Sequence, residues 1–348
     1  MKKILKYGVI VAIAMIIILN LTKVFSIGIN LNEKTGVSKN LAKTAEYIVD
    51  GIPSDSIKPE ETTSSKFDYL KNLKVDQNSN DIEMEAGEVE VSFIDVGQGD
   101  CILITDAGRC MLIDTGNKDS YKAIEEYLHG KGINTVDVLV ITHPDLDHIG
   151  SSVLLLAEFD IPTIYIPDVE GKSRDYTMLM SATRKRNTEV INPVCGLPIT
   201  FGTANYTIYC TNNIEYEDTN SYSLIVKMVN GEDSFLFTGD ATGEETDKII
   251  ADGYDLSAKV LKAAHHGSAN CGCNSESFIK AVNPEGLVIS CGLKNEYGHP
   301  HLETMELAKQ LGLNVYRTDT QGTLEFVSTG LGIKSPKPTD DYRNGNNM

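Results

Sequence analysis

Apolar side chains recur along this chain with the two periods that strands and helices require. Residues 89–95 alternate apolar and polar side chains and end in a glycine turn, and residues 101–105 and 110–114 form a hairpin around Ala107-Gly108. Residues 136–142 are almost continuously apolar, as in a strand that is buried on both faces. Further strands are expected at residues 163–166, 199–210, 223–229, 234–238, 259–263, 287–290, 315–317 and 323–327.

Helical patterns separate these strands. Residues 121–129 fit a helix that ends at Gly130, and residues 176–185, 243–251, 276–282 and 302–311 fit four more. Two groups of strands interleaved with helices predict an α/β (α+β) fold, in which two sheets pack face to face and helices lie outside. Several histidines and aspartates follow predicted strands, so loops at one edge of the sheets can bring them together.

The two ends of the chain depart from this pattern. Lys2, Lys3 and Lys6 precede an apolar run over residues 8–19, which is typical of a signal peptide or signal anchor and is shorter than the about 20 residues of a full membrane span. We therefore expect residues 1–26 to place the protein outside the cytoplasm, either secreted or anchored to the membrane. Residues 27–87 are expected to be a linker, residues 88–333 the folded domain and residues 334–348 a disordered tail.

Charge and cysteine content narrow the function. The formal net charge of −18 argues against a large basic surface that grips nucleic acid, although bound metal cations would offset part of that charge. The basic run at residues 184–186 is interpreted as a solvated helix end. Seven cysteines, an odd number, do not predict a disulfide framework. Most are expected to be reduced or buried, and a bridge between Cys101 and Cys110 stays open.

Six of the 7 histidines lie in three short clusters. The clusters are residues 143–148 (HPDLDH), the pair His265-His266, and His299-Pro300-His301. Imidazole and carboxylate groups are the side chains that hold first-row divalent metals, and a metal that activates water needs several of them converging. The clustering therefore predicts a metal-dependent hydrolase.

Each cluster also has a simpler interpretation. Asp145 or Asp147 could cap a helix, and Asp240, which follows the apolar strand at 234–238, could be an ordinary turn residue. Beside the histidines, we interpret Asp240 as a carboxylate that can bridge two cations. His265 and His266 are expected on a loop, where one ring can bind a metal and the other can transfer a proton.

Six motifs, in order, resemble the metallo-β-lactamase fold superfamily. They are residues 94–100 (IDVGQGD), 112–116 (LIDTG), 143–148 (HxDxDH), 237–240 (FTGD), 265–268 (HHGS) and 297–301 (YGHPH). More narrowly, the chain resembles the soluble hydrolase domain of ComEC-type DNA-uptake proteins over about residues 89–327. The resemblance implies a four-layer αββα sandwich with two divalent metal ions, Mn or Zn with Mg also possible, at one edge.

The resemblance also implies a role for each residue of these motifs. The metal ligands would be His143 and Asp145 for one ion, Asp147, His148 and His266 for the other, and Asp240 as the bridge. The residues expected to act on the substrate are Asp147, His265 as general acid or phosphate contact, and His301 or His299 for transition-state charge. The residues expected to support the ligands are Asp114, Asn220, Ser223, Asp95 and Gln98.

Two departures from the usual superfamily pattern change the first metal site. Asp145 replaces the middle histidine of the usual HxHxDH motif, and no histidine lies between His148 and His265. Asn220 or Ser223 stands about where the missing ligand would lie. Both changes resemble the ComEC-type branch, and they leave the site richer in oxygen, which shifts its preference from zinc toward manganese or magnesium.

The sequence thus predicts an exported, metal-dependent hydrolase, with a phosphodiesterase that cleaves DNA as the first hypothesis. The alternatives are a hydrolase of cell-wall or small phosphoesters, an amide or lactone hydrolase, and a non-catalytic module with a degenerate metal site. A single short apolar segment does not predict a channel, so membrane contact is expected only through residues 1–26. No protein partner is evident.

Overall fold

Two β-sheets form the centre of the computed structural model, which describes residues 87–211 and 214–345. The 8-stranded sheet has the order β15-β14-β1-β2-β3-β4-β5-β6. Its strands are β1 (Val89–Phe93), β2 (Ile102–Asp106), β3 (Arg109–Ile113), β4 (Val138–Val140), β5 (Thr163–Tyr165), β6 (Glu189–Ile191), β14 (Leu324–Ser328) and β15 (Ile333–Lys334).

The second sheet is 7-stranded and has the order β13-β12-β11-β10-β9-β8-β7. Its strands are β7 (Leu197–Ile199), β8 (Asn205–Tyr209), β9 (Ile225–Asn230), β10 (Asp233–Phe237), β11 (Val260–Lys262), β12 (Gly286–Ile289) and β13 (Asn314–Arg317).

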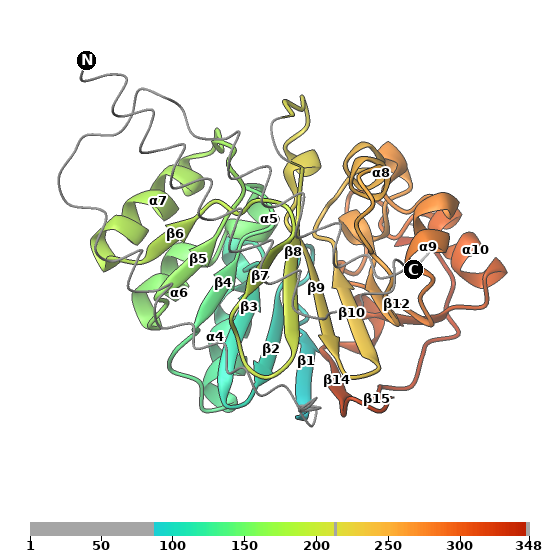
Figure 1. Ribbon diagram of the computed structural model, residues 1–348, viewed down its shortest axis with the longest axis horizontal. Helices are drawn as coiled ribbons and strands as arrows, with labels where there is room; N and C mark the ends of the chain where they lie inside the picture. Colours follow the sequence, from blue (N-terminus) through green and yellow to red (C-terminus); the bar gives the residue numbers. More distant parts are fainter. Residues whose placement is uncertain (1–86, 212–213, 346–348) are drawn as a thin grey trace, which may run out of the picture. The chain divides into compact units, whose positions relative to one another are not determined.

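Helices cover the outer side of each sheet, so the layers are αββα (Figure 1). Those beside the first sheet are α4 (Tyr121–Gly130), α5 (Leu146–Ile149), α6 (Ser152–Glu158) and α7 (Arg174–Arg186), and those beside the second are α8 (Gly243–Ala251), α9 (Glu276–Val282) and α10 (Leu302–Gln310). Shorter elements are α11 (Thr318–Gln321) and the 3-10 turns η1 (Lys118–Ser120), η2 (Thr219–Tyr222), η3 (Ala264–Gly267) and η4 (Asn270–Gly272). The predicted fold class is confirmed.

Three apolar layers hold the sandwich together. Alternate side chains of a strand face the same side, and in β1 the inward residues Val89, Val91 and Phe93 belong to the cluster between the sheets. Phe93 meets Phe237 of β10 there, with ring centroids 6.0 Å apart. Two further clusters join the outer face of each sheet to its helices. Strands such as β4 are buried on both faces for this reason.

Capping side chains fix where three helices begin. Ser173, Thr242 and Ser275 are the N-caps of α7, α8 and α9, and each accepts a hydrogen bond from a backbone N–H of the first turn. The sequence contains these caps, and the predicted bounds 243–251 and 276–282 agree with α8 and α9.

Some elements differ from the prediction. The single strand expected at residues 199–210 is two strands, β7 and β8, because the chain turns where Asp106 accepts hydrogen bonds from the backbone N–H groups of Thr203 and Ala204. Helix α6 is not predicted, since its apolar run at residues 153–156 is continuous and lacks a helical period.

The ends of the chain and the cysteines complete the comparison. Residues 1–86, which include the expected signal or anchor segment and nearly all of the expected linker, lie outside the described residues. Among residues 87–211 and 214–345, no helix has the length and apolar character to cross a membrane. Cys101 and Cys110 are not bridged, because the strand register pairs Cys110 with Thr105.

Residues 334–345 differ from the disordered tail that was expected there. The guanidinium of Arg317 donates a hydrogen bond to the carbonyl of Arg343, Thr339 bridges to Val315, and the Gly345 N–H donates to the carbonyl of Pro300. The segment therefore lies against β13 and reaches the loop that carries His299 and His301.

Candidate metal centre

Strand ends bring the candidate ligands to one edge of the sandwich. The pairs β3/β4 and β10/β11 are parallel, so their carboxyl ends lie side by side. Asp114 directly follows β3, and His143 comes shortly after β4. Asp240 and His265 follow β10 and β11 in the same way. The rigid sheets thus position residues that are far apart in sequence.

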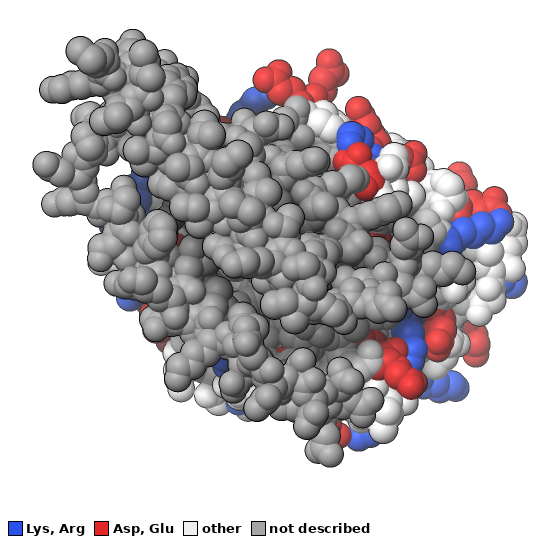
Figure 2. Space-filling view, in the orientation of Figure 1, with Lys and Arg blue, Asp and Glu red and all other residues white. Residues whose placement is uncertain are grey.

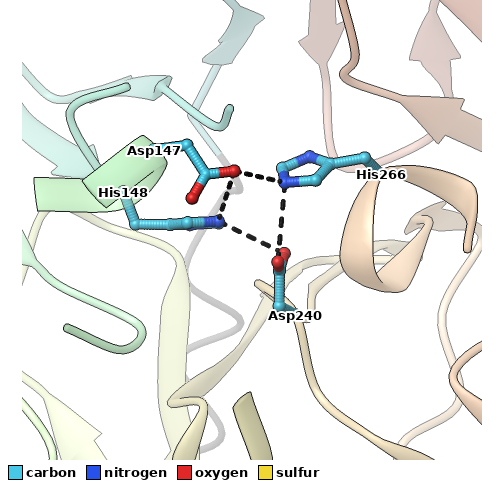
Figure 3. Close-up of side chains that lie close together, drawn as sticks. All are labelled: Asp147, His148, Asp240 and His266. Carbon is cyan, nitrogen blue, oxygen red and sulfur yellow. Dashed lines mark hydrogen bonds and ion pairs between the residues drawn. The ribbon is translucent and has the colours of Figure 1, made fainter. Parts of the chain in front are cut away.

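Four side chains point at a common centre: Asp147, His148, Asp240 and His266 (Figure 3). The Nε2 atom of His266 lies 3.1 Å from Asp147 Oδ2 and 3.5 Å from Asp240 Oδ2. The Nε2 atom of His148 lies 3.3 Å from Asp240 Oδ1. Two imidazoles and two carboxylates form a donor set that suits a divalent first-row metal.

The carboxylate of Asp114 orients two of the histidines. His148 Nδ1 donates to Asp114 Oδ2 across 2.8 Å, and the Thr142 hydroxyl donates to the same oxygen across 2.7 Å. Because that hydroxyl has used its proton, it accepts from His143 Nδ1 at 3.0 Å. Both rings therefore hold a proton on Nδ1 and turn Nε2 toward the centre, which is the atom that binds a metal once it carries no proton.

A third histidine is fixed by the opposite sheet. His266 Nδ1 donates to the carbonyl of Ser290 across 3.0 Å, which turns Nε2 toward the centre. The Nε2 atom donates to Asp147 Oδ2 across 3.1 Å, and a bound metal would replace that proton. Asp100 Oδ1 approaches the same Nδ1 at 3.4 Å, and Asp100 Oδ2 pairs with Lys262 Nζ at 2.8 Å. Asp100 and Lys262 are both buried, so the ion pair lies behind the centre.

Unpartnered buried atoms test whether a metal fits this centre. His143 Nε2, His148 Nε2 and Asp240 Oδ1 are buried, and none has a hydrogen-bond partner among the described residues. Leaving a buried polar atom unpaired costs about 1–3 kcal/mol. Three such atoms at one centre are explained if they are metal ligands, so the residues fit the ion.

The carboxylates and imidazoles at the centre shift one another's pKa values. Burial lowers the pKa of His148, but the carboxylates of Asp240, Asp114 and Asp147 outweigh it and raise that pKa well above its usual range. The pKa of His266 is likewise raised to about 10, because burial is outweighed by Asp240 and other carboxylates. For Asp240, burial is outweighed by the cationic forms of the neighbouring rings, which hold its pKa well below normal. The centre attracts positive charge.

The ligands expected for the other ion are less closely gathered. His143 Nε2 lies 3.9 Å from Asp145 Oδ2 and 3.9 Å from Asp240 Oδ2. The Asp145 side chain is 43% exposed, and it accepts a hydrogen bond from the Thr219 hydroxyl at 2.9 Å. Among the described residues, the four ligands of Figure 3 form a tight cluster that includes neither His143 nor Asp145.

Asn220 and Ser223, the two residues expected in place of the missing histidine, make different contacts. Asn220 follows the Asp145 partner Thr219 in η2, and its Oδ1 is buried with no hydrogen-bond partner in the described part of the chain. Ser223 Oγ accepts a hydrogen bond from the backbone N–H of Asp240 at 3.3 Å. Asn220 therefore offers an oxygen donor, while Ser223 holds Asp240 in position.

The remaining histidines differ in what they can do. His265 Nε2 lies 3.6 Å from Asp240 Oδ2, and its side chain is 26% exposed, so it faces the centre from the open side. His299 is buried behind it, with ring centroids 5.4 Å apart. Both His301 nitrogens are used within the loop: Nδ1 accepts from the Ala269 N–H, and Nε2 meets the Tyr297 carbonyl. His301 thus stabilises the loop that contains Tyr297.

Two residues of the first motif do not reach the centre. Asp95 is exposed and accepts a hydrogen bond from the N–H of Gly97, so it shapes the turn. Gln98 Oε1 accepts from the N–H of Gly292 and ties this turn to the loop after β12. The acid of this motif that does touch a ligand is Asp100.

Close backbone approaches explain two of the motif glycines. A Cβ atom on Gly99 would lie 2.4 Å from the carbonyl oxygen of Asp147, and one on Gly239 would lie 2.6 Å from Thr142. Both glycines also have positive φ. Asp114, His265 and His266 adopt positive φ although they are not glycines, a strained conformation that is concentrated at functional sites.

Sequence reasoning missed Asp100, Lys262 and Thr142. Lys262 lies within an apolar strand, and a buried lysine needs a carboxylate partner. That mismatch between a charged residue and an apolar strand was the available signal. Thr142 gives no comparable signal, because its role depends on the position of Asp114.

A groove of about 750 Å³ opens beside the centre. Its lining includes Asp145, Asp147, Lys172, Asp218 and Tyr297. A substrate in this groove would reach the ligands directly.

Comparison with known proteins identifies the family. Residues 94–270 match the Metallo-beta-lactamase superfamily. The chain belongs to that superfamily. A solved structure from Bacillus subtilis, the metallo-beta-lactamase fold protein YhfI, superposes with a TM-score of 0.51 at 16% identity over 68% of this chain and 99% of that one, which supports the fold.

Several relatives of this superfamily member are ComEC-type competence proteins. The ComE operon protein 3 of Bacillus subtilis is 30% identical over 69% of this chain and 33% of its own length. The competence protein ComA of Neisseria gonorrhoeae is 28% identical over 72% and 34%, and the recombination protein 2 of Haemophilus influenzae is 27% identical over 71% and 30%. The chain thus spans about a third of the length of these relatives. The resemblance inferred from the sequence motifs is confirmed.

Proposed function

We propose that this superfamily member is a metal-dependent phosphodiesterase that cleaves DNA outside the cytoplasm. The observation that carries the proposal is the set of Nε2 atoms of His143, His148 and His266, each turned by a partner on Nδ1 toward the carboxylate of Asp240. The names of the relatives, which refer to competence and recombination, favour DNA as the substrate. The lysines before the apolar run at residues 8–19 favour export.

The residues of the centre divide the chemical work. Two bound divalent ions would activate water and neutralise charge on the phosphoryl oxygens. Asp114 and Thr142 keep His148 and His143 in the metal-binding tautomer. His265 faces the open side of the centre, where it can donate a proton to the leaving oxygen.

Surface charge favours contact through the metal centre rather than through a basic surface. The chain has a net charge of −18, and acidic and basic side chains are intermixed over the surface that is not drawn in grey in Figure 2. Because exposed charges of mixed sign give little attraction to a polyanion, substrate affinity would depend on bound cations and on contacts within the groove.

Activity of the purified chain after metal removal tests the proposal. The protein would be stripped of metal, given manganese, zinc or magnesium, and assayed on single-stranded DNA, duplex DNA and bis-p-nitrophenyl phosphate. We expect cleavage of DNA with manganese, and no cleavage by the Asp240→Asn variant under the same conditions. Manganese binding measured by calorimetry should be lost in parallel.

Other outcomes separate the remaining functions. Turnover of the small diester without cleavage of DNA would move the substrate to another phosphoester. No turnover with any metal by a folded protein would contradict a catalytic function.

A further inference from the structure

Tyr297 stands out among the residues that line the groove. Its side chain is 56% exposed, although large aromatic side chains are usually mostly buried. The hydroxyl of Tyr297 makes no hydrogen bond to any of the described residues. The fold therefore does not account for an aromatic ring at this position.

The ring is nevertheless held in place. It stacks on the buried His299 imidazole, with centroids 5.6 Å apart and planes 20° apart. The loop behind it is fixed by Asn295, whose side chain donates to the carbonyls of Gly292 and His299 and accepts from the His299 N–H. One face of the Tyr297 ring is thus covered by His299, and the exposed part borders the groove.

The rest of the groove does not suit a phosphate chain alone. Asp145, Asp147, Glu217 and Asp218 line it, and Lys172 is the one basic residue among the described lining residues. Bound cations would offset Asp145 and Asp147, whereas Glu217 and Asp218 repel phosphates at distances within the Debye length. A contact in this groove that does not depend on charge would therefore add to the affinity that the cations give.

We propose that Tyr297 is a stacking surface for an unpaired nucleobase adjacent to the phosphate that is cleaved. The proposal rests on the proposed phosphodiesterase function. Every base has a π-face, so such a contact tolerates any sequence. A base inside a duplex already has both faces stacked, so the contact favours single strands.

Two esters with the same leaving group test this role. Thymidine 5′-(p-nitrophenyl phosphate) carries a base, and methyl p-nitrophenyl phosphate does not. In the Tyr297→Ala variant we expect kcat/KM for the thymidine ester to fall about 5- to 100-fold, while kcat/KM for the methyl ester stays unchanged. Tyr297→Phe is the matched control, because it keeps the ring and should retain both activities.

Binding gives a readout that does not need turnover. A single-stranded phosphorothioate oligonucleotide that resists hydrolysis and contains 2-aminopurine should lose fluorescence when it binds the zinc-loaded chain, because stacking quenches that base. Tyr297→Ala should abolish the quenching and Tyr297→Phe should preserve it. Since Tyr297 is exposed, the melting temperature of both variants should match that of the unchanged chain.

Three results would overturn the inference, and they are separable from failure of the proposed function. Equal loss on both esters would mean that Tyr297 acts only by holding His299. Undiminished activity of Tyr297→Ala on the thymidine ester, or undiminished quenching by that variant, would mean that Tyr297 makes no stacking contact with the base. If the unchanged chain hydrolyses neither ester, the phosphodiesterase function fails, and the quenching experiment alone then decides the stacking role.

Discussion

His148 and Asp114 form a buried pair in which His148 Nδ1 donates to Asp114 Oδ2 across 2.8 Å. The second carboxylate oxygen of Asp114 accepts from the backbone N–H of Thr142 at 2.8 Å. Asp114 therefore fixes both the ring of His148 and the backbone that leads into the first histidine cluster. A residue outside the four-ligand cluster of Figure 3 thus controls the geometry of the ligands.

Replacing Asp114 should weaken metal binding without unfolding the chain. Asn has one acceptor oxygen where Asp has two, so Asp114→Asn cannot accept from both His148 and Thr142. Loss of a partner that orients a ligand typically costs about 10- to 100-fold in metal affinity, and we expect that loss in a calorimetric titration with manganese. Asp106→Asn is the control, because Asp106 is also buried and, among the described residues, its side chain accepts hydrogen bonds from Thr203, Ala204 and Tyr206, away from the centre. It should lower stability and leave metal affinity unchanged.

Metal should stabilise the folded chain. A ligand at about 100 times its Kd adds about 2.7 kcal/mol, which corresponds to a rise of about 5–10 °C in melting temperature for a domain of this size. We expect manganese to raise the melting temperature and EDTA to reverse the rise. Asp240→Asn should remove it.

The exposed cluster of Glu125, His129 and Glu158 provides the control for that experiment, because it also holds three possible ligands. His129→Ala should keep the full rise in melting temperature. A rise lost in His129→Ala and kept in Asp240→Asn would place the ion at the exposed cluster instead.

The buried ion pair behind His266 should be sensitive to loss of one partner. Lys262→Met leaves the buried Asp100 Oδ2 without its lysine partner, and breaking a buried pair costs about 3–5 kcal/mol. Adding Asp100→Asn should restore part of this, because it removes the buried charge that lost its partner. Lys280→Met is the control, since Lys280 and Glu276 form an exposed pair. Urea unfolding checks all four proteins, and equal stability of Lys262→Met and the unchanged chain would contradict the pair.

Local pattern predicts the fold well where an element depends on its own residues. Helices α8 and α9 carry their caps and apolar periods within the sequence, and their bounds agree with the prediction. The turn between β7 and β8 is different, because Asp106 shapes it from 97 positions away. The segment 334–345 is likewise ordered by Arg317 and Val315, which no local pattern indicates.

The candidate site was likewise predictable where its residues lie close in sequence, and not where its contacts are long-range. The clusters at residues 143–148 and 265–266 were identifiable because several ligands lie close in sequence. Asp95 and Asp100 flank the same glycine turn, and only contact with Lys262 and His266 distinguishes them. The sequence does not distinguish His299 from His301, because both flank the same proline. In the structure His301 uses both ring nitrogens within its loop.

Glu245 should make stability fall as pH rises. Its side chain is buried in the first turn of α8, and neither carboxylate oxygen has a hydrogen-bond partner among the described residues. Burial raises the pKa of Glu245 well above its usual range, opposed in part by the backbone of Ser223. In the unfolded chain the pKa of a Glu side chain is about 4.3. An acid whose pKa is raised by folding contributes stability that is complete below that pH and is lost as pH rises toward the folded pKa.

Glu245→Gln removes this titration, so its stability relative to the unchanged chain should increase from pH 5 upward. The increase should be at most about 1.4 kcal/mol for each pH unit until the folded pKa is reached. Melting temperatures of the metal-free proteins between pH 4 and pH 8 measure it. Glu244→Gln is the matched control, since Glu244 is the exposed neighbour in the same turn and should show no such trend. A constant difference between Glu245→Gln and the unchanged chain across this range would mean that Glu245 stays charged in the fold.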